Sequence, residues 1–106
     1  MKILFDQGTP VPLRKLLPKH LVVTAYELGW QTLENGDLIS AAEADGFDVI
    51  VTTDQNLKYQ QNLAGRRISI LVLSSTSWPR IRENASSIQE ALDNLEPSLF
   101  LEVKIT

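Results

Sequence analysis

The sequence contains no cysteine, only one methionine and one histidine, and no long hydrophobic run. Without cysteine, the chain forms neither disulfides nor thiolate zinc sites, and it has no cysteine nucleophile. This absence is typical of a reducing compartment, and we therefore expect a cytoplasmic protein. No hydrophobic stretch approaches the ~20 residues that cross a bilayer, so we expect no membrane partner. The first residues already read as a strand, which predicts that no signal peptide precedes the fold.

The remaining composition is typical of one globular domain. The chain has 106 residues, 43% of them hydrophobic and 22% charged, which is enough for one hydrophobic core. Residues 1–106 are therefore predicted to form a single domain. The net charge of −3 argues against tight nonspecific binding of nucleic acid through charge alone. We interpret His20, which precedes the apolar residues 21–23, as a surface or strand-edge residue.

The charges are unevenly distributed along the chain. Between residues 27 and 54 there are seven acidic residues and no basic ones, and between residues 55 and 82 there are five basic residues and no acidic ones. One interpretation is that a metal-binding acidic cluster lies next to a basic rim that binds phosphate. The other is that both stretches are solvated surfaces that partly neutralise each other.

Hydrophobic periodicity predicts an α/β fold. Short apolar runs indicate buried strands of a mostly parallel sheet, and apolar residues spaced by three and four indicate helices that cover it. The predicted fold is a three-layer α/β/α sandwich. In the last segment apolar and polar residues alternate, which predicts an edge strand and makes it a candidate for antiparallel pairing and for a homodimer interface. The predicted strands cover residues 2–5, 21–24, 48–53, 68–73 and 99–105, and the predicted helices cover residues 13–17, 35–45, 56–63 and 78–95.

Two aspartates follow predicted strands, and a third begins a predicted helix. Asp6 and Asp54 each come directly after a strand, and Asp37 lies in the first turn of helix 35–45. Ligands of open α/β sheets bind at the carboxyl ends of strands, and two carboxylates that meet there repel each other unless a cation or proton lies between them. Magnesium commonly takes one or two protein carboxylates and can generate a hydroxide nucleophile. The alternative is structural: Asp37 favours the helix N-terminus, and Asp6 and Asp54 close turns.

Three stretches of the chain form a longer pattern: residues 1–6, residues 24–29 with 34–42, and residues 49–57. In their order and spacing they resemble the DUF5615 family of PIN-like proteins, relatives of the toxin nucleases of bacterial toxin–antitoxin pairs. The resemblance implies one PIN-like domain over residues 1–106. It also implies cleavage of RNA that depends on Mg²⁺ or Mn²⁺, with RNA and an antitoxin protein as partners.

The resemblance also implies roles for individual residues. Asp6, Asp37 and Asp54 would be catalytic and would hold the metal ion that activates the attacking water, and the amide oxygen of Asn56 would be a further ligand. Basic residues after the third aspartate would contact backbone phosphates. These implied phosphate contacts are Lys58, Arg66 and Arg67.

The chain departs from the family's pattern beside two of the aspartates. Gln7 and Gly8 follow the first acid where family members commonly have Glu-Asn, and Asn56 stands where they have a second aspartate. Amides carry no negative charge and so weaken metal binding, and we expect the glycine to loosen the loop that positions Asp6. The departures support an alternative, a catalytically degenerate PIN-like protein that acts as a binding or interaction module. A phosphate-receiving regulator would need a lysine near the final strand, and Lys104 lies in the alternating segment instead.

Overall fold

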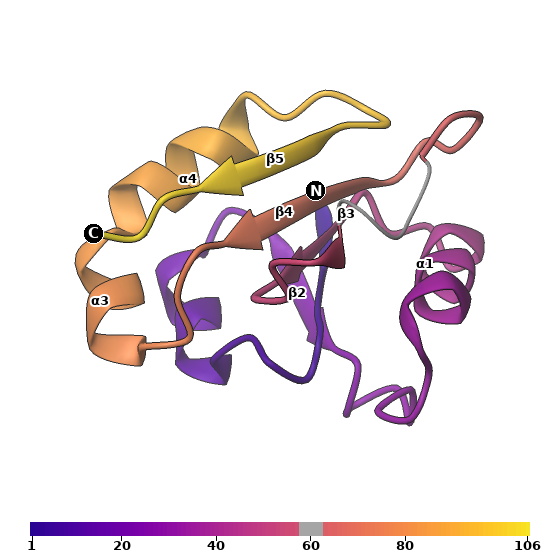
Figure 1. Ribbon diagram of the computed structural model, residues 1–106, viewed down its shortest axis with the longest axis horizontal. Coiled ribbons are helices and arrows are strands. Elements are labelled where there is room, and N and C mark those ends of the chain that lie inside the picture. The colour runs from indigo at the N-terminus through magenta and orange to yellow at the C-terminus, as the bar shows by residue number, and fades with distance from the viewer. Residues whose placement is uncertain (58–62) are drawn as a thin grey trace.

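Five short apolar runs form one parallel sheet. The computed structural model describes residues 1–57 and 63–106, and its sheet has the strand order β2-β1-β3-β4-β5, with every neighbouring pair parallel (Figure 1). β3 and β4 are buried along their whole length, as expected of inner strands that are covered on both faces. The strands are β1 (Lys2–Phe5), β2 (Leu21–Thr24), β3 (Val49–Thr52), β4 (Ser69–Leu73) and β5 (Phe100–Val103).

Helical segments cover both faces of this sheet, and the predicted α/β sandwich is confirmed. The 3-10 helix η1 (Val11–Leu16) and the helices α3 (Trp78–Glu83) and α4 (Ala85–Asp93) pack on one face. Helix α1 (Asn35–Ala44) packs on the other face. Within the described ranges, no helix has the length and apolar character that crossing a membrane requires.

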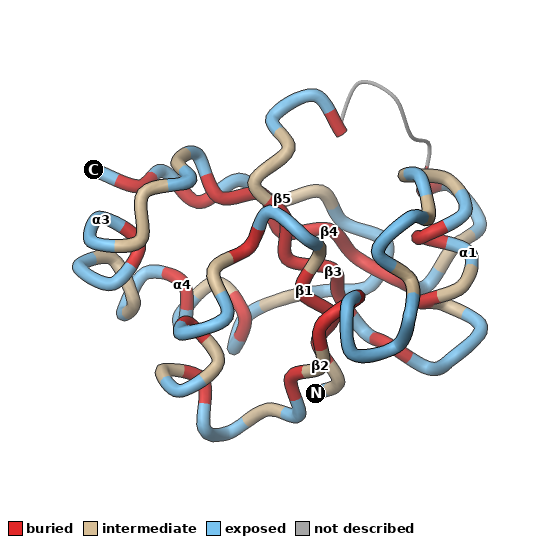
Figure 2. Tube along the Cα trace, turned by 90° about the horizontal axis from the view of Figure 1, so that it is seen from below, coloured by how far each residue is buried: buried red, intermediate tan, exposed pale blue. Residues whose placement is uncertain are grey.

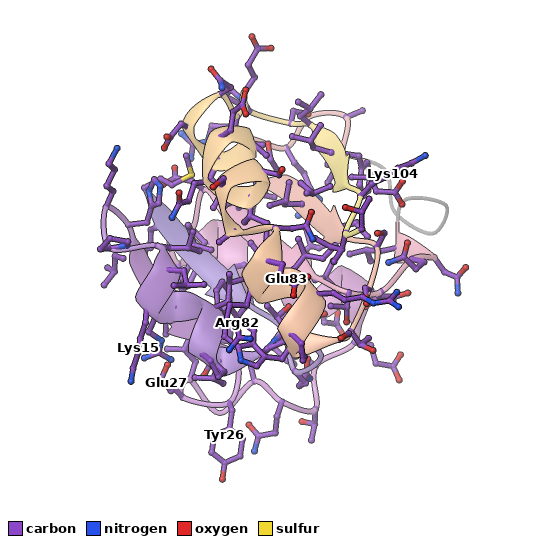
Figure 3. All side chains as sticks on the ribbon, turned by 90° about the vertical axis from the view of Figure 1, so that its left-hand side faces the viewer. Lys15, Tyr26, Glu27, Arg82, Glu83 and Lys104 are labelled. Carbon is purple, nitrogen blue, oxygen red and sulfur yellow. The ribbon has the colours of Figure 1, made fainter. Side chains whose placement is uncertain are left out.

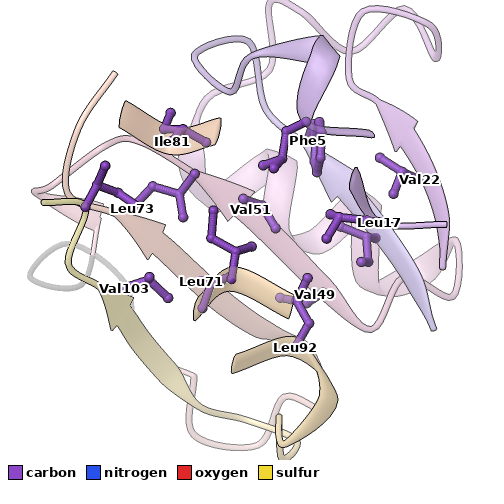
Figure 4. Packing of buried hydrophobic residues seen from close by; sticks show 14 residues of the cluster. Phe5, Leu17, Val22, Val49, Val51, Leu71, Leu73, Ile81, Leu92 and Val103 are labelled. Carbon is purple, nitrogen blue, oxygen red and sulfur yellow. The ribbon is translucent and has the colours of Figure 1, made fainter. Parts of the chain in front are cut away.

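The alternating side chains of the strands divide the interior into two hydrophobic cores. In β1, Ile3 and Phe5 face η1, α3 and α4, whereas Leu4 faces α1. All three side chains are fully buried. Figure 4 shows the first core, where Phe5, Leu71 and Ile81 gather from three different elements. In Figure 2 the buried residues run through the central strands, and the exposed residues lie on the outer turns.

Two connections between parallel strands have opposite hands. The β2–β3 connection contains α1, and the β4–β5 connection contains α3 and α4; both move the chain in the same direction across the sheet, but over opposite faces. Because nearly all such crossovers are right-handed, one of these two is of the rare left-handed kind. The result is that η1, α3 and α4 share a single face.

Three predicted elements differ from the structure. β5 is parallel to β4, because the chain crosses the sheet between them and enters β5 from the same end, so the antiparallel alternative is wrong. The helix predicted over residues 78–95 is two helices that meet at Asn84. The Asn84 side chain donates to the carbonyl of Arg80 at 2.8 Å and so competes with the helical backbone bonds. The helix predicted over residues 13–17 is the 3-10 helix η1, and the one predicted over 56–63 includes residues 58–62, outside the described ranges.

The two ends of the chain lie at opposite edges of the sheet. β1 begins at the second residue, so Met1 lies at the amino edge, where its ammonium nitrogen is 3.1 Å from Nδ1 of His20. The other ring nitrogen of His20 lies 3.6 Å from a carboxylate oxygen of Asp93 in α4. After β5 the backbone N–H of Ile105 donates to the hydroxyl of Ser74 at 2.7 Å, at the carboxyl edge. His20 is thus half-buried and joins the start of β2 to α4.

We expect Leu71→Ala to lower the free energy of unfolding by about 2–5 kcal/mol, because this fully buried side chain of β4 would leave a cavity in the first core. Leu21→Ala is the matched control: Leu21 is 61% exposed on β2, and its truncation should change stability by less than about 0.5 kcal/mol. Denaturant unfolding of both variants measures the two values. Equal losses would contradict the placement of Leu71 in the core.

Candidate functional site

The carboxyl ends of β1 and β3 form the topological switch point of the sheet, from which the chain leaves in opposite directions. From β1 the chain runs to β2 on one side, and from β2 it crosses to β3 on the other side of β1. Sheets with this strand order bind ligands in the crevice at such a point. Asp6 and Asp54 follow these two strands, and the backbone N–H of Asp6 donates to the carbonyl of Val51 at 3.2 Å. The fold therefore brings two of the three predicted aspartates to one edge of the sheet, where each lies just after the end of one of two neighbouring strands.

Asp6 is a half-buried carboxyl group surrounded by hydroxyl and amide donors. Its Oδ1 accepts from the backbone N–H of Gly8 at 3.1 Å, and its Oδ2 accepts from the hydroxyl of Thr52. Thr9 Oγ1 lies 2.8 Å from both Asp6 Oδ1 and the Val51 carbonyl, although a hydroxyl has one proton to donate. Both contacts are satisfied together when Asp6 carries a proton and donates it to Thr9.

The pKa of Asp6 is shifted mainly by burial. Burial raises the pKa above the ordinary aspartate value, and the hydrogen bonds from Thr52 and Thr9 offset the rise only in part. No ion pair to Asp6 is present within residues 1–57 and 63–106. Asp6 is therefore a carboxylate whose negative charge is poorly compensated by the protein itself.

The hydroxyl of Thr52 links the two aspartates. It donates to Oδ2 of Asp6 and accepts from the backbone N–H of Asp54 at 3.0 Å. Asp54 is also half-buried, and its Oδ2 accepts from the side-chain amide of Asn35, at the start of α1, at 3.4 Å. One short network thus joins the ends of β1 and β3 to the first turn of α1.

Both aspartates also have the structural role predicted as the alternative. Oδ1 of Asp6 accepts from the N–H of Gly8, and Oδ1 of Asp54 accepts from the N–H of Asn56 at 3.0 Å, two residues later in each case. Such bonds close tight turns after the strands. In each residue the other carboxylate oxygen points to a different partner, so closing a turn and presenting an oxygen to a ligand are compatible roles.

The third predicted aspartate, Asp37, lies in the same helical turn as Asn35, which bonds Asp54. It lies exposed in the first turn of α1, as the sequence predicted, but within the described ranges no group of three or more acidic or histidine side chains is close enough to hold a metal ion. Asn56 is exposed. The side-chain amide of Gln7 donates to the carbonyl of Gln31, which ties the loop after β1 to the loop after β2.

Two residues of the predicted basic rim, Arg66 and Arg67, lie at the opposite edge of the sheet. Arg66 and Arg67 come shortly before β4, and residues that precede a parallel strand lie at the amino edge. Arg66 pairs with Glu43 of α1 at 3.3 Å, and Glu43 also accepts from the backbone N–H of Arg67 at 2.7 Å. The bond from Arg67 is the main reason that the pKa of Glu43 lies below its usual value. The expected juxtaposition with Asp6 and Asp54 is therefore wrong for both arginines, and Lys58 lies outside the described residues.

A cleft of about 400 Å³ opens beside Asp6, at the carboxyl ends of β1 and β2. Figure 3 looks onto this edge, where Tyr26 and Glu27 lie on the turn after β2 and Lys15 lies on η1. Glu27 and Thr24 exchange hydrogen bonds of 2.9 and 3.1 Å, which is the reciprocal pattern of a helix capping box. The spacing Thr-x-x-Glu was a signal for this ordered turn in the sequence. The residues that line the cleft are Asp6, Gln7, Thr9, Val11, Arg14, Thr24, Tyr26 and Glu27.

The donor atoms at the two aspartates fit a hard divalent cation. They are carboxylate and hydroxyl oxygens, with amide oxygens nearby, which is the ligand set that Mg²⁺ and Mn²⁺ prefer. Two carboxylates are enough for Mg²⁺, which usually keeps several water ligands. A cation would also compensate the charge of Asp6 that burial leaves unpaired.

No known protein family, curated protein or solved structure matches the chain. The parallel sheet with its covering helices shows an α/β sandwich. The resemblance to PIN-like proteins rests on the sequence stretches around the three aspartates.

Gly8 allows the backbone after β1 to lie close to the side chain of Thr53, where a larger residue would clash. A Cβ at this position would lie 2.6 Å from Thr53 Oγ1, so we expect Gly8→Ala to lower the free energy of unfolding by about 1–3 kcal/mol through overpacking. The glycine thus lets the Asp6 loop pack against the end of β3, and its loosening of the loop stays a prediction. The double variant Gly8→Ala/Thr53→Ala should recover part of the loss in a denaturant double-mutant cycle. Strictly additive losses would contradict the clash.

We expect Asp6→Asn to stabilise the protein near neutral pH, because it removes a buried charge and keeps a similar shape. The raised pKa means that the folded protein binds this proton more tightly than the unfolded chain, so wild-type stability falls as pH rises from the ordinary value of 3.8 through the folded pKa. The gain in stability of the variant over the wild type should be largest above the pKa of Asp6 in the folded protein and should vanish below pH 3.8. Thermal melts of both proteins across this pH range measure which of the two is more stable. A variant less stable at neutral pH would contradict this expectation.

Proposed function

We propose that this protein is a metal-dependent ribonuclease of PIN-like type, with Asp6 and Asp54 at its catalytic centre. The observation that carries the proposal is that these two aspartates follow neighbouring strands at the switch point of the sheet and share the hydroxyl of Thr52. The hard oxygen donors there, together with the resemblance in sequence, favour phosphodiester hydrolysis over other reactions of strand-end carboxylates.

Each residue of the network has a role in this proposal. Asp6 and Asp54 would hold Mg²⁺ or Mn²⁺, and Thr52 would tie the carboxylate of Asp6 to the backbone of Asp54. When bound, the metal supplies Lewis acidity and lowers the pKa of water for attack on phosphorus. Because burial raises the pKa of Asp6, a proton would compete with the metal for this carboxylate in acid, so activity should decline there.

The alternative, a catalytically degenerate PIN-like protein that acts as a binding module, is favoured by one observation. In the described part of the chain, no group of three or more acidic or histidine side chains is arranged to hold a metal ion. Under this alternative Asp6 and Asp54 would only close turns, and RNA or a protein would bind without being cleaved. The roles of the protein as a toxin, of an antitoxin as its partner and of a homodimer stay predictions from the sequence.

Cleavage of single-stranded RNA with Mg²⁺ or Mn²⁺ tests the proposal. We expect metal-dependent cleavage by the wild type and a loss of about 100-fold or more in Asp6→Asn and in Asp54→Asn, since changes even outside the ligand shell of metal sites cost up to about 100-fold. Glu102→Gln, an exposed change on β5, is the matched control and should keep full activity. Asp37→Asn should keep its activity if two carboxylates hold the metal and lose it if three do. Cleavage that survives both Asp6→Asn and Asp54→Asn would refute the assignment, and no cleavage by the wild type would favour the binding module.

A further inference from the structure

The cleft beside Asp6 combines features that the proposed metal site does not use. Its volume of about 400 Å³ lies within the range of sites that bind small molecules. Two of its lining side chains are strongly exposed: Tyr26 at 74% and Val11 at 54%. Exposed large side chains at a polar rim favour a contact with a flat, partly apolar ligand.

Tyr26 is held by an ordered turn although its ring is exposed. The N–H of Ala25 donates to the carbonyl of Phe5 at 2.8 Å, which ties the turn to the end of β1. Within the turn, the N–H of Gly29 donates to the carbonyl of Tyr26 at 3.1 Å, and that of Trp30 to the carbonyl of Ala25 at 2.8 Å. A ring on such a support loses little conformational entropy when a ligand stacks on it.

Arg14 is fixed in the same cleft by an ion pair. Its two terminal nitrogens lie 2.6 and 3.3 Å from the carboxylate oxygens of Glu27, and Glu27 also accepts from the backbone N–H of Thr24. The hydrogen bond from Arg14 holds the pKa of Glu27 below its usual value, so the pair stays charged at neutral pH. Of the five N–H groups of Arg14, the one on Nε is buried, and those on the two terminal nitrogens that Glu27 does not take can donate to a ligand.

We propose that this cleft binds a nucleobase of single-stranded RNA. The base would stack on Tyr26 and would accept hydrogen bonds from Arg14 at its polar edge, next to Asp6. This proposal rests on the proposed function, because it places the base beside the phosphodiester that Asp6 and Asp54 would act on. Lys15 on η1 and Arg82 on α3 are exposed (Figure 3) and would contact neighbouring phosphates.

The test measures binding without cleavage. The probe is a fluorescein-labelled single-stranded RNA of about ten nucleotides, titrated in EDTA and followed by fluorescence anisotropy, with wild type, Tyr26→Ala, Tyr26→Phe and Leu21→Ala. We expect Tyr26→Ala to bind about 10-fold more weakly, because one stacking contact is lost. Tyr26→Phe keeps the ring and should bind like wild type. Leu21→Ala removes an exposed apolar side chain at the amino end of β2 and should also bind like wild type.

Three results would overturn the proposal: no RNA binding by the wild type, unchanged affinity in Tyr26→Ala, or an equal loss in Leu21→Ala. A melt of each variant establishes that it is folded. The binding and cleavage experiments separate the two proposals. If the wild type cleaves RNA with metal and Tyr26→Ala binds RNA with unchanged affinity, only the proposed base site is refuted. If RNA binds through Tyr26 but is never cleaved, only the proposed nuclease function is refuted.

Discussion

The carboxyl edge of the sheet depends on β1 being hydrogen-bonded along both sides. β2 and β3 arrive from different parts of the chain, and each pairs with the same four-residue strand in parallel register. Beyond the strands the pairing continues: the N–H of Asp6 bonds to Val51, and the N–H of Ala25 bonds to Phe5. These bonds fix the first residues of two loops, and so Asp6 and Tyr26 stand on rigid backbone although both lie outside the strands.

The Asp6 environment has two ways to compensate a buried carboxyl group. A proton on Oδ1 satisfies Thr9, and a cation satisfies the charge. The hydroxyl groups around Asp6 suit both states, because Thr9 and Thr52 either donate or accept. An arginine or lysine in contact with Asp6 would remove this choice by pairing the charge permanently. Arg14, in the same cleft, is instead neutralised by Glu27.

Most of the fold follows from local pattern, whereas parts of the site follow from topology or from packing. Apolar runs such as residues 49–51 indicate strands, and Asp6 and Asp54 meet because parallel strands end at one edge. The same rule excludes Arg66 and Arg67 from that edge, since they precede a strand. The position of Asp37 depends on how α1 lies on the sheet, which no local pattern specifies. The helix break at Asn84 arises from a side chain that bonds the preceding turn.

The opposite placement of the chain ends has a practical geometric consequence. A linker, label or fused domain attached before Met1 would leave from the amino edge, on the far side of the sheet from Asp6. The same attachment after Thr106 would emerge at the edge that carries the cleft, because β5 runs parallel to β1 and its end is bonded to Ser74. The choice of terminus therefore decides whether an immobilised molecule presents its carboxyl edge to solution or to the support.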